Sequence, residues 1–188
     1  MSKIGRKSID ISGLTVDVKG HVVNYKGANA SGSYELPVEL NAQVEGQSLQ
    51  LIPAKNEGES AKSARDLNRV WGLHRALLFN ELSGAKKEFE NNLEIVGLGF
   101  KAAITGNKIV FTLGYSHKID YEIPEGVTIT VDKSGQKLVI KSADKELAGH
   151  VCSKIKFLRQ PEPYKGTGIK LSTDKIKLKA GKAKSAGA

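Results

Sequence analysis

Residues 160–170, QPEPYKGTGIK, combine side chains and backbone suited to binding a phosphate backbone. The two prolines restrict the chain. Glycines let backbone N–H groups approach phosphates closely, and lysines supply positive charge to phosphate oxygens. A tyrosine ring can stack on an unpaired base. The expected contacts are Tyr164, Lys165, Gly166, Gly168 and Lys170. An ordinary Pro-Gly turn with a tyrosine in the core is the alternative interpretation.

Further basic residues surround this stretch. Residues 153–188 hold 10 basic and 2 acidic side chains, whereas residues 1–152 hold 19 and 18, so most of the chain's net charge of +9 lies at one end. Such a distribution indicates a polyanionic partner. We add to the candidates the lysines and the arginine that precede the stretch and two lysines that follow it: Lys154, Lys156, Arg159, Lys175 and Lys177.

Two polyanions fit a basic end of this kind, nucleic acid and an anionic membrane surface. Residues 177–186 carry one leucine among lysines and small residues. A membrane-surface segment needs bulky apolar side chains between its lysines, so nucleic acid is favoured. A solvated tail that serves solubility is the remaining interpretation. No apolar run approaches the roughly 20 residues of a membrane helix, and the basic start leads into no signal peptide.

The residues that most often perform catalysis or bind metals form no convincing group. No two of His21, His74, His117 and His150 have the spacing of metal ligands on one helix face. His74 lies in an apolar helical stripe, which is typical of a satisfied, partly buried histidine. Cys152 also fits an apolar stripe, and His150 points away from it on the same helix. We therefore predict no catalytic residue, no metal site and no cofactor.

An internal repeat indicates how these residues are positioned. Tyr-Glu-Leu-Pro at residues 34–37 recurs as Tyr-Glu-Ile-Pro at residues 121–124, which is 87 residues later. At the same offset Val22 and Val23 fall on Ile109 and Val110. An ordered series of matches indicates two copies of one module rather than chance.

Each copy begins with short alternating or β-branched segments, which predict strands. These are residues 14–18, 22–25, 42–44 and 49–52 in the first copy, and 108–113, 127–131 and 138–140 in the second.

Each copy then continues into an amphipathic segment, which predicts a helix. The first helix is expected to start at a capping box of Ser63 and Asp66 and to stop at Ser83-Gly84. Its apolar stripe consists of Leu67, Val70, Trp71, His74, Leu77 and Leu78.

The second helix is expected to begin after Asp144 and to end before Pro161. Its apolar stripe consists of Ala148, Val151, Cys152, Ile155 and Leu158.

The predicted fold is therefore α+β, with two tandem duplicated modules, each an antiparallel or mixed sheet covered by one helix. The first module spans residues 1–83. The second spans residues 84–172 and carries the basic binding end. A basic, flexible C-terminal tail spans residues 173–188.

Several motifs resemble one known family, that of ribosomal protein six of the large subunit in its bacterial form. The motif PEPYKGTGI at residues 161–169 carries the resemblance most strongly, and SKIGRK at residues 2–7 resembles the family's opening. Residues 93–100, 113–117 and 121–126 (LEIVGLGF, LGYSH and YEIPEG) resemble its second domain. Thr167, Gln160 and Ser8 depart from the residues usual in the family, so no phosphate contact is carried over to Thr167.

The resemblance implies a structural RNA-binding protein with two similar α+β modules and no catalysis. It implies binding to large-subunit ribosomal RNA, mainly through the second module and the tail, in a cytoplasmic bacterial ribosome. The implied location is near the sarcin–ricin loop and the base of the stalk, beside neighbouring large-subunit proteins, where translational GTPases dock. Lys3, Arg6 and Lys7 are additional candidates for RNA contact. A free RNA-binding or assembly factor and an enzyme with a site between the modules are the competing functions.

Overall fold

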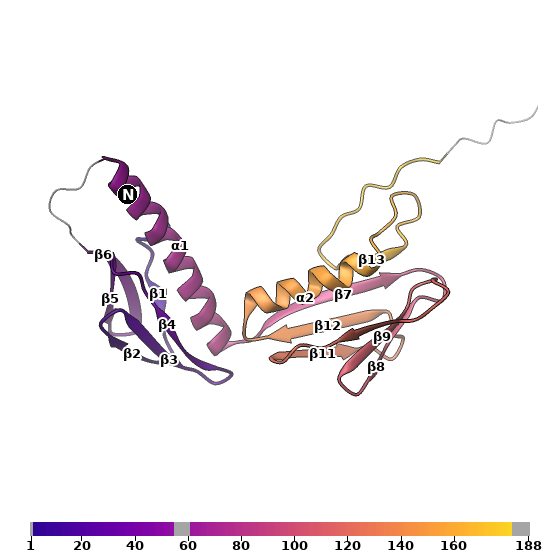
Figure 1. Cartoon of the computed structure of the whole chain (residues 1–188), viewed down its shortest axis with the longest axis horizontal. Coiled ribbons are helices and arrows are strands. Elements are labelled where there is room, and N and C mark those ends of the chain that lie inside the picture. Colours follow the sequence, from indigo (N-terminus) through magenta and orange to yellow (C-terminus); the bar gives the residue numbers. More distant parts are fainter. Residues whose placement is uncertain (1, 55–60, 182–188) are drawn as a thin grey trace, which may run out of the picture. The chain divides into compact units, whose positions relative to one another are not determined.

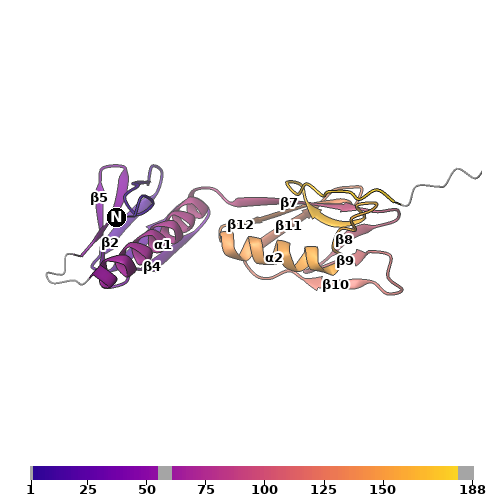
Figure 2. The same ribbon diagram turned by 90° about the horizontal axis from the view of Figure 1, so that it is seen from above.

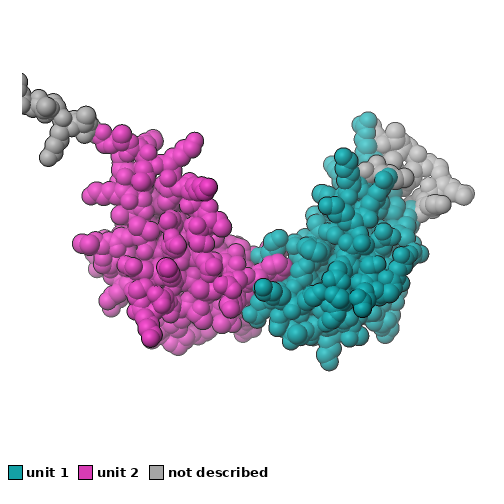
Figure 3. Space-filling model, turned by 180° about the vertical axis from the view of Figure 1, so that it is seen from behind, with its two compact units in different colours: residues 1–88, 143–145 teal, residues 89–142, 146–188 magenta. Residues whose placement is uncertain are grey.

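The computed structural model describes residues 2–54 and 61–181, and it divides into two compact units. Unit 1 comprises Met1–Glu88 with Ala143–Lys145, and unit 2 comprises Phe89–Ser142 with Glu146–Ala188 (Figure 3). Within the described ranges the elements are strands and two helices, so the α+β fold class is confirmed (Figures 1 and 2). All pairings between the described strands are antiparallel.

Unit 1 contains two small sheets and one helix. One sheet has the order β2-β3-β4, with β2 at Thr15–Lys19, β3 at Val22–Lys26 and β4 at Ser31–Glu35. The other has the order β1-β6-β5, with β1 at Ile9–Asp10, β6 at Ser48–Pro53 and β5 at Leu40–Glu45. Helix α1 spans Ala61–Lys86 and contributes Trp71, Leu78, Leu82 and Ala85 to the core of this unit.

Both predicted ends of the first helix are wrong. Helix α1 begins two residues before Ser63, and Asp66 forms an ion pair with Arg69 at 2.9 Å. At the other end α1 continues through Gly84 to Lys86. The last carbonyls of the helix have partners from outside it, because the Asn29 backbone N–H donates to the Ala85 carbonyl at 3.1 Å and the Asn29 amide donates to the Lys86 carbonyl at 3.3 Å. A glycine cap is therefore not needed.

The apolar stripe of the first helix is only partly confirmed. Trp71 and Leu78 are buried, but Leu77 is 39% exposed. A helix advances about 100° per residue, so a stripe through Trp71, Leu78 and Leu82 places Leu77 at its solvent side.

Unit 2 has the same kind of architecture with an additional strand. Its three-stranded sheet has the order β10-β9-β8, with β10 at Ile119–Glu122, β9 at Lys108–Thr112 and β8 at Lys101–Thr105. Its four-stranded sheet has the order β11-β12-β7-β13, with β11 at Val127–Val131, β12 at Lys137–Ser142, β7 at Phe89–Val96 and β13 at Gly168–Leu171. Helix α2 spans Lys145–Leu158, directly after Asp144, as predicted.

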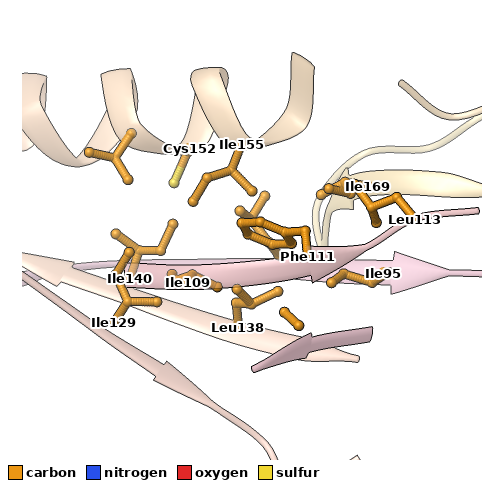
Figure 4. Packing of buried hydrophobic residues seen from close by; sticks show 13 residues of the cluster. Ile95, Ile109, Phe111, Leu113, Ile129, Leu138, Ile140, Cys152, Ile155 and Ile169 are labelled. Carbon is orange, nitrogen blue, oxygen red and sulfur yellow. The ribbon is translucent and has the colours of Figure 1, made fainter. Parts of the chain in front are cut away.

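The core of unit 2 lies between α2 and the sheets (Figure 4). Cys152 and Ile155 point from the helix toward Ile140 and Ile109 in Figure 4, and Phe111 is fully buried among them. The predicted stripe of α2 is confirmed, since Ala148, Val151, Cys152 and Ile155 are buried. Among the residues that the structure describes, neither helix is long and apolar enough to cross a membrane.

Strand β13 is one of several strands, among them β1, β4 and β10, that the sequence does not predict, and it is the one that shapes the basic end. The predicted binding stretch ends at Lys170, yet residues 168–171 pair with β7, with Gly168 opposite Val96 and Lys170 opposite Glu94. The chain therefore leaves α2, forms the excursion of residues 159–167, and returns to the sheet. We call this excursion the closed loop.

Candidate nucleic-acid interface

Backbone hydrogen bonds hold the closed loop at its base and across its tip. The Ile169 N–H donates to the Arg159 carbonyl at 2.8 Å, which joins the two ends of the loop. Within it, the Glu162 N–H donates to the Thr167 carbonyl and the Gly166 N–H donates to the Glu162 carbonyl, both at 2.9 Å. The Thr167 hydroxyl also donates to the Glu162 carboxylate at 3.1 Å. These bonds fix the loop conformation in the free protein.

The two glycines of the loop serve its own folding. Gly168 has a φ of +143°, and a Cβ there would lie 2.6 Å from the Gln160 carbonyl oxygen. Gly166 has a φ of +70°, and its N–H is already bonded to Glu162. Packing and backbone conformation therefore explain both glycines. Their contact with a phosphate remains a prediction.

The predicted cationic residues fall into two groups. Lys156 is bound to Asp174 at 2.6 Å, and Lys170 is bound to Glu94 at 3.1 Å. The other lysines are exposed, and no ion pair joins them to an acidic side chain in the described part of the chain: Lys154, Lys165, Lys175 and Lys177. Exposed cations without an intramolecular partner are the ones best placed for phosphates.

The ion pair with Lys156 also favours the ionised form of the Asp174 carboxyl. The pKa of the Asp174 carboxyl is lowered from its ordinary value, chiefly by the hydrogen bond that the Lys156 ammonium donates and further by the Leu171 N–H. The carboxylate is therefore ionised at neutral pH and ties the start of the tail to α2.

Tyr164 is exposed to solvent, whereas Arg159 packs over aromatic rings. The Tyr164 side chain is 55% exposed, so the alternative of a core tyrosine is wrong. The Arg159 guanidinium lies over two rings, 4.9 Å from the Tyr115 centroid and 5.7 Å from the Phe100 centroid. The Tyr115 hydroxyl donates to the Leu158 carbonyl at 3.1 Å. Arg159 is thus held in place by cation–π contacts as well as by the loop base.

The sequence does not predict the aromatic partners of Arg159 as site residues. Tyr115 stacks with His117 at 6.2 Å between ring centroids, and both lie in the exposed connection between β9 and β10. The LGYSH motif at residues 113–117 contributes only to the family resemblance. No sequence pattern predicts the contact of Tyr115 with Leu158, because that contact depends on how β9 and α2 pack.

The tail is attached to the closed loop in its described part. The Lys179 N–H donates to the Pro163 carbonyl at 2.8 Å, and Leu178 lies beside Gly166. Residues 173–181 therefore bring Lys175, Lys177 and Lys179 to the same end of unit 2 as Lys165. Residues 182–188 of the predicted flexible tail lie outside the described residues.

His74 and Cys152 have the surroundings of structural residues rather than catalytic ones. His74 shares a hydrogen bond of 2.8 Å with the Tyr34 hydroxyl, as expected of a satisfied histidine. Cys152 is buried, and burial raises the pKa of its thiol, which disfavours the nucleophilic thiolate. In residues 2–54 and 61–181, no three His, Cys, Asp or Glu side chains gather to hold a metal ion. Lys3, Arg6 and Lys7 are exposed in unit 1.

Comparisons with known proteins agree with these observations. The family model for ribosomal protein L6 matches residues 96–171, which include the closed loop and β13. Proteins named large ribosomal subunit protein uL6 are similar over nearly the whole chain. The one from Campylobacter lari is 39% identical over 97% of this chain and 98% of its own length.

Two further relatives of that name give the same result. The protein from Moorella thermoacetica is 40% identical over 97% of this chain and 96% of its own length. The protein from Bartonella tribocorum is 38% identical over 98% of this chain and 100% of its own length. These relatives are structural proteins rather than enzymes, in agreement with the prediction of no catalysis. The chain therefore belongs to the ribosomal protein L6 family of the large ribosomal subunit.

Proposed function

We propose that this protein is a structural constituent of the large ribosomal subunit and binds large-subunit ribosomal RNA through one end of unit 2. The binding surface consists of the C-terminal end of α2, the closed loop and the described start of the tail. Exposed lysines neutralise phosphates there, while the shape of the fixed loop selects a folded RNA site. Family membership and the charge of residues 153–188 support this function.

The observation that carries the proposal is that exposed lysines gather on a prebuilt support. The base of the closed loop is bonded at 2.8 Å, and the tail is bonded to the loop at 2.8 Å. Lys154, Lys165, Lys175 and Lys177 extend from this support without ion partners among the described residues. A rigid cationic surface binds a polyanion without the entropic cost of ordering a loop.

Salt-dependent binding tests the roles of the lysines. Each phosphate contact contributes roughly 0.7 to 0.9 to the slope of log affinity against log salt. The double variant Lys154→Ala with Lys165→Ala should therefore lower the slope by roughly 1.5, measured with a sarcin–ricin fragment of ribosomal RNA. Lys26→Ala, an exposed lysine of unit 1, is the matched control and should leave the slope unchanged.

Two outcomes would count against the proposal. An unchanged slope in the double variant would remove these lysines from the binding surface. Equal binding to an unrelated large-subunit RNA fragment of the same length would contradict the proposed selectivity.

The family also supports a finer location. We propose that the bound RNA lies near the sarcin–ricin loop and the base of the stalk, in contact with neighbouring large-subunit proteins. In that position the protein supports the docking of translational GTPases indirectly, by holding the RNA in shape. The site of action is then the cytoplasm, where bacterial ribosomes work.

We further infer that the two units descend from one duplicated module. In unit 1, β3 lies between β2 and β4, and β6 lies between β1 and β5. In unit 2, β9 lies between β8 and β10, and β12 lies between β7 and β11. The strand pairing allows the two units to be aligned residue by residue, because Val23 lies opposite Tyr34 in unit 1 and Ile109 lies opposite Tyr121 in unit 2. On this inference Val23 corresponds to Ile109, and the offset in this strand is 86 residues rather than 87.

A further inference from the structure

A hollow of about 430 Å³ lies beside the closed loop, on the solvent side of the last turn of α2. It is lined by residues of the helix and by the first residues after it: Ser153, Lys156, Phe157, Gln160 and Pro161. Its volume falls within the range usual for small-ligand sites, roughly 300 to 1,000 Å³. The candidates of the sequence analysis include only Lys156 from this group.

Phe157 is the unusual member of the lining. Its side chain is 69% exposed, although its neighbour Ile155 is completely buried. A single exposed apolar residue needs no explanation on an ordinary surface. This ring, however, borders a hollow in which two of the other lining residues are held in place. The ion pair of 2.6 Å with Asp174 holds Lys156, and the prolyl ring restricts the chain at Pro161.

The charges around the hollow favour RNA over a protein as the occupant. None of the described residues that line the hollow is acidic. Lys154 is exposed and lies three residues before Phe157, so the two share one face of α2. A cation beside an exposed ring is the arrangement with which proteins bind unpaired nucleotides, the cation taking the phosphate and the ring taking the base.

We propose that this hollow receives one unpaired base of the ribosomal RNA, stacked on Phe157. The amide of Gln160 can both donate and accept hydrogen bonds, so it can bond to the edge of that base. Lys154 binds the adjacent phosphate. The inference rests on the proposed function, since it names the part of the RNA that this surface takes beyond the phosphates.

Substitutions at position 157 separate stacking from charge. Phe157→Ala should weaken binding of the sarcin–ricin RNA fragment about tenfold at every salt concentration. The slope of log affinity against log salt should stay the same, because no cation is removed. Phe157→Trp should preserve the affinity, and Phe157→Leu should bind as weakly as the alanine variant. Phe79→Ala removes a Phe that is 42% exposed in unit 1 and should bind like the unaltered protein.

Each contrary result has a distinct meaning. Unchanged affinity of Phe157→Ala, with a lowered slope in the lysine double variant, would overturn the stacking proposal alone. Full affinity of Phe157→Leu would also overturn it, since an apolar contact without a ring would then suffice. Absence of binding by the unaltered protein would overturn both the proposed function and this inference.

Discussion

Gly168 illustrates, at the scale of a single residue, how tightly the RNA-binding end is built. Its Cα lies so close to residues 160 and 161 that a Cβ would come within 2.7 Å of the Pro161 Cα as well. Both obstacles are backbone, which cannot move aside as a flexible side chain can. The φ of +143° adds a conformational cost for any other residue. The glycine is thus required before any RNA is bound.

A pair of glycine substitutions tests this at the residue scale. Gly168→Ala should lower the free energy of unfolding by more than about 1 kcal/mol, because the closed loop must separate from β13. Gly149→Ala is the matched control on the exposed face of α2, where a Cβ would meet nothing within 4 Å. It should raise the stability by roughly 0.5 to 1 kcal/mol, as expected for alanine inside a helix. Urea unfolding measures both, and equal effects would contradict the close approach.

At the scale of elements, the notable feature is that α2, the closed loop, β13 and the tail support one another. The Ile169 N–H closes the loop on α2, Lys170 pairs with Glu94 of β7, and Lys156 of α2 binds Asp174 of the tail. Two of the predicted phosphate-binding lysines are therefore partly occupied in holding these elements together. We expect them to contribute less to RNA affinity than Lys154 and Lys165.

The Asp174 ion pair predicts a pH dependence at this scale. Because the folded-state pKa of Asp174 lies below its ordinary value, the pair stabilises the fold fully above about pH 4. The contribution is lost as the pH falls through the lowered pKa. Asp174→Asn should thus cost up to about 1 kcal/mol at pH 7, as for a partly exposed pair, and progressively less as the pH falls through the lowered pKa. The difference between the urea midpoints of the two proteins, followed from pH 7 to 2, measures it. A constant difference would contradict the ion-pair explanation.

The sequence predicts strictly alternating strands and amphipathic helices well, and it predicts poorly the strands and contacts that depend on long-range partners. Residues 127–131 form β11 with the predicted bounds, since strict alternation needs no tertiary information. Strand β13 was missed because the glycines and lysines of residues 168–171 give no strand pattern, and only pairing with β7 makes them one. The contact of Arg159 with Tyr115 was missed for the same reason. Phe157 gives no signal in the sequence, because a single exposed ring does not disturb the apolar stripe of a helix.

At the scale of the whole molecule, the chain holds two separate apolar cores. The core of unit 1 is built around Trp71, Leu78 and Leu82, and the core of unit 2 around Phe111, Leu138 and Ile140. In the described part of the chain, the two clusters share no residue. RNA binding is proposed for one unit, so the other core can be weakened without direct damage to the binding surface.

Core substitutions test this separation. Phe111→Ala removes a fully buried ring from unit 2 and should cost about 3 to 5 kcal/mol. Amide hydrogen exchange should then speed up in unit 2, while the amides of unit 1 keep their protection. Leu78→Ala should do the reverse. Equal loss of protection throughout the chain in either variant would show that the two units unfold as one.

Strand β7 is made well before β13, the strand that pairs with one of its edges. The strands β8 to β12 and helix α2 are synthesised in between, and this edge of β7 stays unpaired until residues 168–171 are made. An unpaired strand edge attracts other chains, so this delay is a period of risk for aggregation. The strand that ends the risk also completes the closed loop. A nascent chain interrupted before β13 would therefore lack the RNA surface and keep an open edge, which links readiness to assemble with protection from misassembly.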